Sequence, residues 1–198
     1  MRADDEHLVG RCLQGDTDAY GLLVERYQGA VYATAHYYVG RYGSAEDVAQ
    51  EALMEAYRSL PKLRDATRFG PWLKEVTCRT AANWLRRHGR RINSETPLPF
   101  RKRATIEDFR EGPATRTERA ETYERVQLAI DSLPERYRLP VMLRFLQELS
   151  YEEISAFTGD PVDEVRGLLQ RAGRQLRELL ADMNGESEGE TTWHRVRK

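Results

Sequence analysis

The side chains best suited to chemistry in this sequence are arginines and glutamines that recur at helical spacing. Arg166, Gln170 and Arg174 lie at i, i+4 and i+8, so they share one face of a helix. Guanidinium and amide groups on such a face can hydrogen-bond to phosphates and base edges, which is the chemistry of nucleic-acid recognition. The alternative is a solvated arginine face on an ordinary helical hairpin.

A second basic group lies near the middle of the chain. Seven basic side chains and one acidic side chain fall between 86 and 103, although the whole chain carries a net charge of −1. The group begins with Arg86, Arg87, Arg90 and Arg91. Such a cluster favours contact with a polyanion even when the total charge is near zero. A solvated charge run beside a linker is the alternative interpretation.

A third candidate site is the polar turn formed by Asp47, Gln50 and Glu51. It lies on a predicted helix whose other face is apolar. Acidic side chains on an exposed turn can pair with basic residues of a protein partner. Asp47 also stands three residues after Ser44, a spacing typical of a capping box, so it can stabilise the helix start as well.

Catalysis and metal binding have little support in the residue pattern. The histidines His7, His36, His88 and His194 are scattered, no GxxxxGK[ST] loop occurs, and Cys12 and Cys78 form no cluster. We therefore predict no catalytic residue, no metal site and no cofactor. The chain has no run of 18 apolar residues and no apolar leader, so neither a membrane span nor a signal peptide is expected. Unpaired cysteines fit a cytoplasmic protein.

The periodicity of the apolar residues predicts an all-α protein built from two small helical domains joined by an extended linker. The first domain is expected at 5–91, as a helical bundle, and the second at 119–183. Between them, 92–118 contains Pro and Gly and little periodic apolar content, which is typical of a linker. Residues 184–198 are expected to form a disordered tail.

The second domain contains the pattern of a helix-turn-helix. Ser150 and Glu153 can form a capping box, and Gly159 can end the short helix in a left-handed conformation. Asp160 and Pro161 can then begin a longer helix that carries the arginine face. In this motif the second helix lies in the major groove of DNA.

Four stretches of the chain resemble the extracytoplasmic-function (ECF) sigma factors of bacterial RNA polymerase, in family order. These stretches are GDTDAYGLLVERY, SAEDVAQEALMEAYRSL, RFGPWLKEVTCRTAANWLRRHGRR and the second-domain segment SLPERYRLPVMLRFLQELSYEEISAFTGDPVDEVRGLLQRAGRQLREL. The resemblance implies a factor that binds core RNA polymerase and directs transcription initiation at promoters. Its implied partners are core polymerase, promoter DNA and an anti-sigma protein. A two-domain helix-turn-helix regulator that does not bind core polymerase is the alternative.

The resemblance also implies roles for individual residues. The residues expected to bind core polymerase are Asp47, Gln50 and Glu51. Those expected at the −10 element are Arg79, Asn83, Trp84, Arg86, Arg87, Arg90 and Arg91. Those expected at the −35 element are Glu164, Arg166, Gln170, Arg171 and Arg174. Trp72 is predicted to pack in the core, because it shares the face of Val76.

The chain departs from the family pattern at several of these positions. Arg79 replaces a usual asparagine, Asn83 a common aspartate, and Gly173 a common arginine. Asp163 and Glu164 replace small and hydroxyl residues. From their places in the helix, we predict that Asp163 stabilises the helix start and that Glu164 reads a cytosine N4 amino group in the −35 element.

Overall fold

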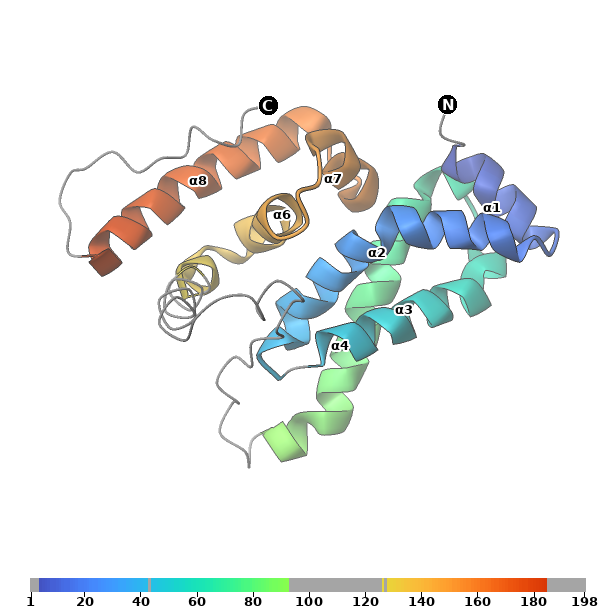
Figure 1. The fold of residues 1–198 in the computed structure, drawn as a ribbon, viewed down its shortest axis with the longest axis horizontal. Coiled ribbons are helices and arrows are strands. Elements are labelled where there is room, and N and C mark those ends of the chain that lie inside the picture. The colour runs from blue at the N-terminus through green and yellow to red at the C-terminus, as the bar shows by residue number, and fades with distance from the viewer. Residues whose placement is uncertain (1–3, 43, 93–125, 127, 185–198) are drawn as a thin grey trace, which may run out of the picture.

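The computed structural model describes residues 4–42, 44–92, 126 and 128–184, and the described part is helical without strands, which confirms the predicted all-α class. The predicted linker, apart from Ile92, and the predicted tail, apart from Asn184, lie outside the described residues. In the first group of helices (Figure 1) the bounds are α1 Asp5–Leu13, α2 Thr17–Val39, η1 Gly40–Tyr42, α3 Ala45–Ser59, η2 Leu60–Lys62, η3 Ala66–Arg68 and α4 Phe69–Ile92. In the second group they are α6 Glu135–Phe145, α7 Tyr151–Thr158 and α8 Val162–Asn184.

Local capping explains several of the helix boundaries. Asp16 begins α2 by accepting hydrogen bonds from the backbone N–H groups of Asp18 and Ala19, at 3.0 and 3.1 Å. Ser44 precedes α3 as predicted, but it forms no capping bond, so the capping-box prediction there is wrong. Its φ of −114° and ψ of 16° depart from the extended conformation that aims an N-cap side chain at the first turn.

The first group packs around α2, which contacts α1, α3 and α4. Its core includes many small and branched side chains that let the helices approach closely, such as Ala33, Val48 and Val76. Trp72 is half-buried and packs against this core beside Phe69, in agreement with the prediction. The core therefore fixes the outward faces of α3 and α4.

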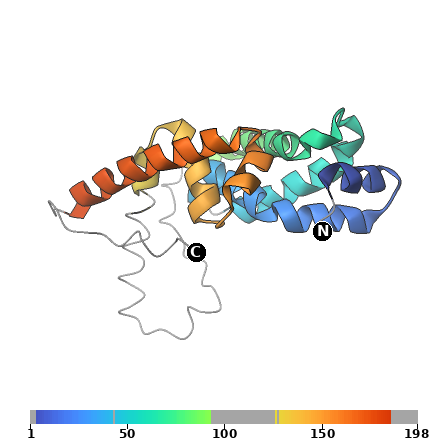
Figure 2. The same cartoon turned by 90° about the horizontal axis from the view of Figure 1, so that it is seen from above.

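The second group of helices packs against the first group. α6 contacts α2, and α7 contacts the beginning of α4 (Figures 1 and 2). The Phe157 ring of α7 lies 6.1 Å from that of Tyr27 in α2, and the Tyr27 ring lies 5.5 Å from that of Phe69. Lys74 donates a hydrogen bond to the carbonyl oxygen of Thr158 at 3.3 Å. The two predicted domains thus share an aromatic interface.

Gly70 allows the closest approach between the two groups. A Cβ added at this position would overlap with the carbonyl oxygen of Ala156 and would lie 3.1 Å from the Cα of Phe157. Both obstacles are backbone atoms of α7, so no side-chain movement can relieve them. Glycine at this position is therefore a requirement of the packed arrangement.

Among the described residues, no helix combines the length and apolar content needed to cross a membrane.

Candidate functional site

The polar turn of α3 faces away from the core. Asp47 and Gln50 are exposed and Glu51 is half-exposed, whereas Val48 and Ala52 on the opposite side are fully buried. The structure therefore brings the three predicted side chains together on one accessible face. Their carboxylates and amide can meet a protein partner without any change in the helix.

An apolar groove adjoins this turn, and the sequence pattern does not predict it. Its volume is about 520 Å³, and it is lined by Thr17, Tyr20, Val24, Gln50, Leu53, Met54, Tyr57 and Arg58. Met54 is 54% exposed and Tyr57 is 44% exposed, although the periodicity assigns Tyr57 to the core face. Exposed apolar side chains beside polar ones mark a protein-binding surface. The sequence does contain one sign of this groove. Leu53 and Met54 are adjacent, so the apolar side chains of α3 cover more than one face of the helix.

Tyr20 supports the groove from α2. Its hydroxyl donates to the carbonyl oxygen of Leu53 at 2.5 Å, and its ring lies 4.8 Å from the ring of Tyr57. Burial raises the pKa of the Tyr20 hydroxyl, so this group stays protonated and remains a donor. The bond fixes the spacing between α2 and the exposed edge of α3.

The second half of α4 carries the predicted −10 side chains. Arg79, Asn83, Arg86 and Arg87 are exposed, and Asn83 accepts a hydrogen bond from Arg86 at 2.8 Å. The side chains of Arg90 and Arg91 lie outside the described residues. The described arginines thus form a continuous cationic face along the helix.

One contact joins the α4 face to the polar turn of α3. Arg87 Nη2 lies 2.9 Å from Glu51 Oε1, and both side chains are about half-exposed. An exposed pair of this kind contributes about 0.2–1 kcal/mol, so either partner can exchange it for another charged group at small cost. Glu51 and Arg87 therefore remain available for binding.

Trp84 is partly buried, packs against the core and belongs to an aromatic stack. Its ring lies 4.3 Å from the ring of His88 at an interplanar angle of 20°, and 6.2 Å from the ring of Tyr42 at 28°. His88 Nδ1 is also 2.9 Å from the carbonyl oxygen of Trp84. The i, i+4 spacing of Trp84 and His88 could have indicated this pair, whereas Tyr42 comes from η1.

The helix-turn-helix has the predicted local geometry. Ser150 and Glu153 form the capping box, with bonds of 2.9 and 3.1 Å, and Gly159 has a φ of +83°. The α8 helix begins at Val162, with the carbonyl oxygen of Pro161 accepting from the N–H of Val165. The predicted −35 side chains Glu164, Arg166, Gln170, Arg171 and Arg174 are all outside the buried stripe of α8. The inward side chains Val165, Leu169, Ala172 and Leu176 are buried.

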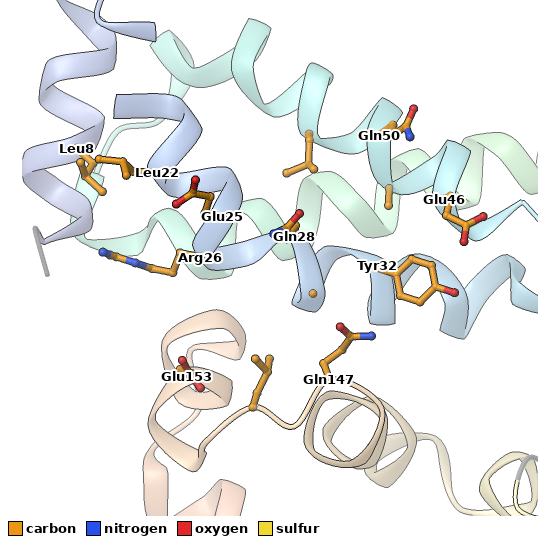
Figure 3. A pocket seen from close by; sticks show the side chains of 14 residues that line it. Leu8, Leu22, Glu25, Arg26, Gln28, Tyr32, Glu46, Gln50, Gln147 and Glu153 are labelled. Atoms are coloured by element: carbon orange, nitrogen blue, oxygen red, sulfur yellow. The ribbon is translucent and has the colours of Figure 1, made fainter. Parts of the chain in front are cut away.

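A groove of about 910 Å³ lies between the two groups of helices (Figure 3). Glu46 and Gln50 line it from α3, Tyr32 from α2, and Gln147 and Glu153 from the second group. Figure 3 shows Gln147 directed toward α2. The groove therefore presents polar side chains of both groups to one ligand-sized space.

The described residues contain no group of three or more His, Cys, Asp or Glu side chains placed to hold a metal ion.

Comparison with known proteins identifies two family regions. The model for sigma-70 region 2 matches residues 23–91, and the model for sigma-70, region 4 matches residues 123–176. The first match contains α3 and nearly all of α4, and the second contains α6, α7 and most of α8. Three of the four resembling stretches fall mainly within these two regions, and GDTDAYGLLVERY overlaps the beginning of the first.

Curated relatives match over most of the chain. The ECF RNA polymerase sigma-E factor of Escherichia coli K12 is 38% identical over 173 residues, which cover 85% of this chain and 90% of the relative. The RNA polymerase sigma-H factor of Pseudomonas aeruginosa is 34% identical over 188 residues, which cover 92% and 97%.

Two solved structures share the fold. The structure of CnrH in complex with the cytosolic domain of CnrY matches with a TM-score of 0.55 and 22% identity, covering 92% of this chain and 99% of that chain. The sigma factor RpoE from Bartonella quintana, in complex with the anti-sigma factor NepR, matches with a TM-score of 0.50 and 20% identity, covering 81% and 96%.

Proposed function

The chain belongs to the sigma-70 family of RNA polymerase sigma factors, in its ECF group, and we propose that α3 holds core polymerase while α4 and α8 contact the promoter. As a sigma factor, the protein directs transcription initiation together with RNA polymerase. Its own contribution is binding, and RNA synthesis belongs to the polymerase.

One observation supports the assignment of these residues to polymerase and DNA. Three polar faces are exposed, and they follow one another along the chain in the order that the family has. The polar turn of α3, the cationic face of α4 and the arginine face of α8 all point to solvent, opposite buried apolar stripes. Each face can therefore bind its partner without unfolding a core. A pull-down of core polymerase by the full chain in the absence of DNA tests the first of these contacts, because a regulator that acts without core polymerase would not be retained.

Docking on polymerase would use two kinds of contact. Asp47 and Glu51 would pair with basic side chains, and the groove beside Met54 and Tyr57 would receive apolar ones. Apolar anchors surrounded by a polar rim are the usual anatomy of a protein interface. This combination explains why large apolar side chains stay exposed on α3.

At the −10 element, the α4 arginines would hold the phosphate backbone. The stack of Trp84 and His88 stands among them and offers aromatic rings to unpaired bases, since every base has a face that can stack. The phosphate contacts would fix the position of the DNA, and stacking would hold the bases of the opened strand.

We expect the double variant Arg86→Ala, Arg87→Ala to weaken promoter binding by the holoenzyme to a similar degree for all sequences. The slope of log affinity against log salt should decrease by about 0.7–0.9 for each phosphate that the variant no longer neutralises. Adding Arg90→Ala and Arg91→Ala should decrease this slope further. Binding titrations over a series of salt concentrations measure this slope.

The matched control is Lys62→Ala, Arg64→Ala, which removes two exposed charges at the opposite end of α4. It should leave the slope unchanged. An altered base preference with an unchanged slope for the Arg86, Arg87 variant would show that these side chains read bases.

At the −35 element, Glu164→Ala should relax the preference at one base pair by about 1–3 kcal/mol, because a carboxylate in the major groove accepts a hydrogen bond from cytosine N4. Glu164 is exposed in the first turn of α8 and can enter the groove. Binding to duplexes with each single substitution measures the preference, and Glu178→Ala, farther along α8, serves as the control. Uniformly tighter binding to every duplex would refute base reading by Glu164.

An anti-sigma protein is the expected regulatory partner, and the structure of RpoE bound to NepR is an example of such a complex. The groove between the two groups of helices would give this partner access to Gln50 and Gln147 together. We propose that the protein acts in the cytoplasm, where RNA polymerase works.

A further inference from the structure

Two guanidinium groups contact the ring of Tyr151, the first residue of α7. Arg144, from the last turn of α6, lies 5.4 Å from the ring centroid, and Arg166, from α8, lies 5.7 Å from it. Both distances are within the range of cation–π attraction. The three helices of the second group thus bring two positive charges to one aromatic side chain at the beginning of the helix-turn-helix.

Each of the two arginines has a second anchor. Arg144 donates to the carbonyl oxygen of Leu149 at 2.9 Å, and Arg166 donates to Asp163 Oδ1 at 2.6 Å. The Asp163 side chain is 92% exposed and that of Arg166 is 55% exposed, so burial does not force this pair together. Asp163 therefore pairs with Arg166 in addition to its place in the first turn of α8.

The two anchors of Arg166 determine where its free donors lie. A guanidinium has five N–H groups in a rigid plane, and one of them is bound to Asp163. Contact with Tyr151 places the group beside the first turn of α7. In a helix-turn-helix the first helix crosses the DNA backbone, whereas the recognition helix meets the base edges.

From this geometry we propose that Asp163 and Tyr151 position Arg166 so that, together with Arg144, it holds a backbone phosphate at the edge of the −35 element. Asp163 is a positioning residue: by itself its carboxylate repels phosphate, and it favours binding only through Arg166. The inference rests on the proposed function of α8 in −35 recognition and assigns Arg166 to the backbone, while Glu164 and Gln170 remain the candidates for base reading.

The test is a double-mutant cycle on DNA binding by the holoenzyme, assembled from core polymerase and the full chain. The probe is a pool of promoter duplexes with a randomised −35 region, and the bound fraction is sequenced. In an Arg166→Ala background, Asp163→Asn should tighten binding, because it removes a repulsive carboxylate. With Arg166 present, Asp163→Asn should tighten binding less or should weaken it. The changes in affinity that it causes in the two backgrounds should therefore differ by about two- to tenfold.

Arg166→Ala alone should lower affinity equally for all −35 sequences. Its salt slope should decrease by about 0.9, so a fourfold rise in salt should cost the variant about 3.5-fold less affinity than it costs the unchanged chain. Tyr151→Leu should lower affinity in the same sequence-independent way, while Tyr151→Phe, which keeps the ring, should not. Glu152→Gln removes an exposed carboxylate next to Tyr151 and should show no coupling to Arg166.

Equal effects of Asp163→Asn in the two backgrounds would overturn the positioning role. A changed preference at one base pair in Arg166→Ala would overturn the phosphate assignment and make Arg166 a base reader. Thermal unfolding of each variant separates these outcomes from a loss of folding. If the unchanged holoenzyme shows no −35 preference in the pool, the proposed function of α8 fails, and this result is distinct from a failed cycle.

Discussion

Asp47→Arg combined with Gln50→Ala is expected to lower the affinity of the chain for core polymerase by about 30-fold or more, equal to about 2 kcal/mol. The change places a positive charge where the proposed interface supplies basic partners, and like charges across an interface are costly. Both side chains are exposed, so the buried face of α3 should be unaffected. Reversing the charge of Asp47 in the first turn costs about 0.3–1 kcal/mol against the helix dipole, which is less than the expected loss of binding. Titration of labelled chain with core polymerase measures the affinity, and circular dichroism checks the helix content.

Glu75→Arg is the control for this variant, because it reverses one exposed carboxylate on the first half of α4, away from the polar turn. It should bind core polymerase like the unchanged chain. Normal affinity of the Asp47, Gln50 variant would place the docking surface elsewhere. Met54→Ser should also weaken binding, because it removes an exposed apolar side chain from the groove beside the turn.

Gly70→Ala is expected to separate the two groups of helices while leaving each group folded. The added methyl group meets backbone atoms of Ala156 and Phe157 in α7, and forcing such contacts costs about 1–3 kcal/mol. The packed arrangement should therefore open, with an increase in the radius of gyration measured by small-angle X-ray scattering. Because the affected contacts join α4 to α7, helix content should stay the same.

Gly173→Ala is the matched control for Gly70→Ala. Its added methyl group meets nothing within 4 Å, and alanine is favoured over glycine in a helix by about 1 kcal/mol. This variant should be slightly more stable and keep the packed arrangement. An unchanged radius of gyration in Gly70→Ala would contradict the importance of this contact.

Opening of this interface has a consequence for promoter binding. Arg86 and Arg87 belong to the first group of helices, and Arg166 and Arg174 belong to the second. The packed arrangement therefore holds the proposed −10 and −35 faces in one fixed relation, which opening of the interface would release. We expect the holoenzyme with Gly70→Ala to bind promoter DNA at least as well as the holoenzyme with the unchanged chain.

Much of the local structure follows from the sequence. Ser150, Glu153 and Gly159 specify the boundaries of α7 through capping and a left-handed residue, and these signals act within a few positions. The exposed arginines of α8 follow from spacing alone, because the opposite stripe of the helix is apolar. Signals of this kind depend only on neighbouring residues, so sequence patterns suffice to predict them.

Other features depend on partners far along the chain. Tyr27, Gly70 and Phe157 look like ordinary helix residues in sequence, yet they meet across the interface between the two groups. Periodicity indicates which face of a helix is apolar but not which helix covers it. The contact of Arg166 with the Tyr151 ring is a smaller example, since it joins two helices, whereas the pair of Arg166 with Asp163 at i, i+3 is local.

Run-off transcription is the sharpest test that the protein directs transcription initiation as a sigma factor. Core polymerase, fragmented genomic DNA and the full chain are combined, and transcripts are mapped by their 5′ ends. We expect transcripts that start at defined positions only when the chain is present, preceded by shared −10 and −35 sequences. Absence of chain-dependent start sites, with core polymerase active under a control sigma factor, would contradict this expectation.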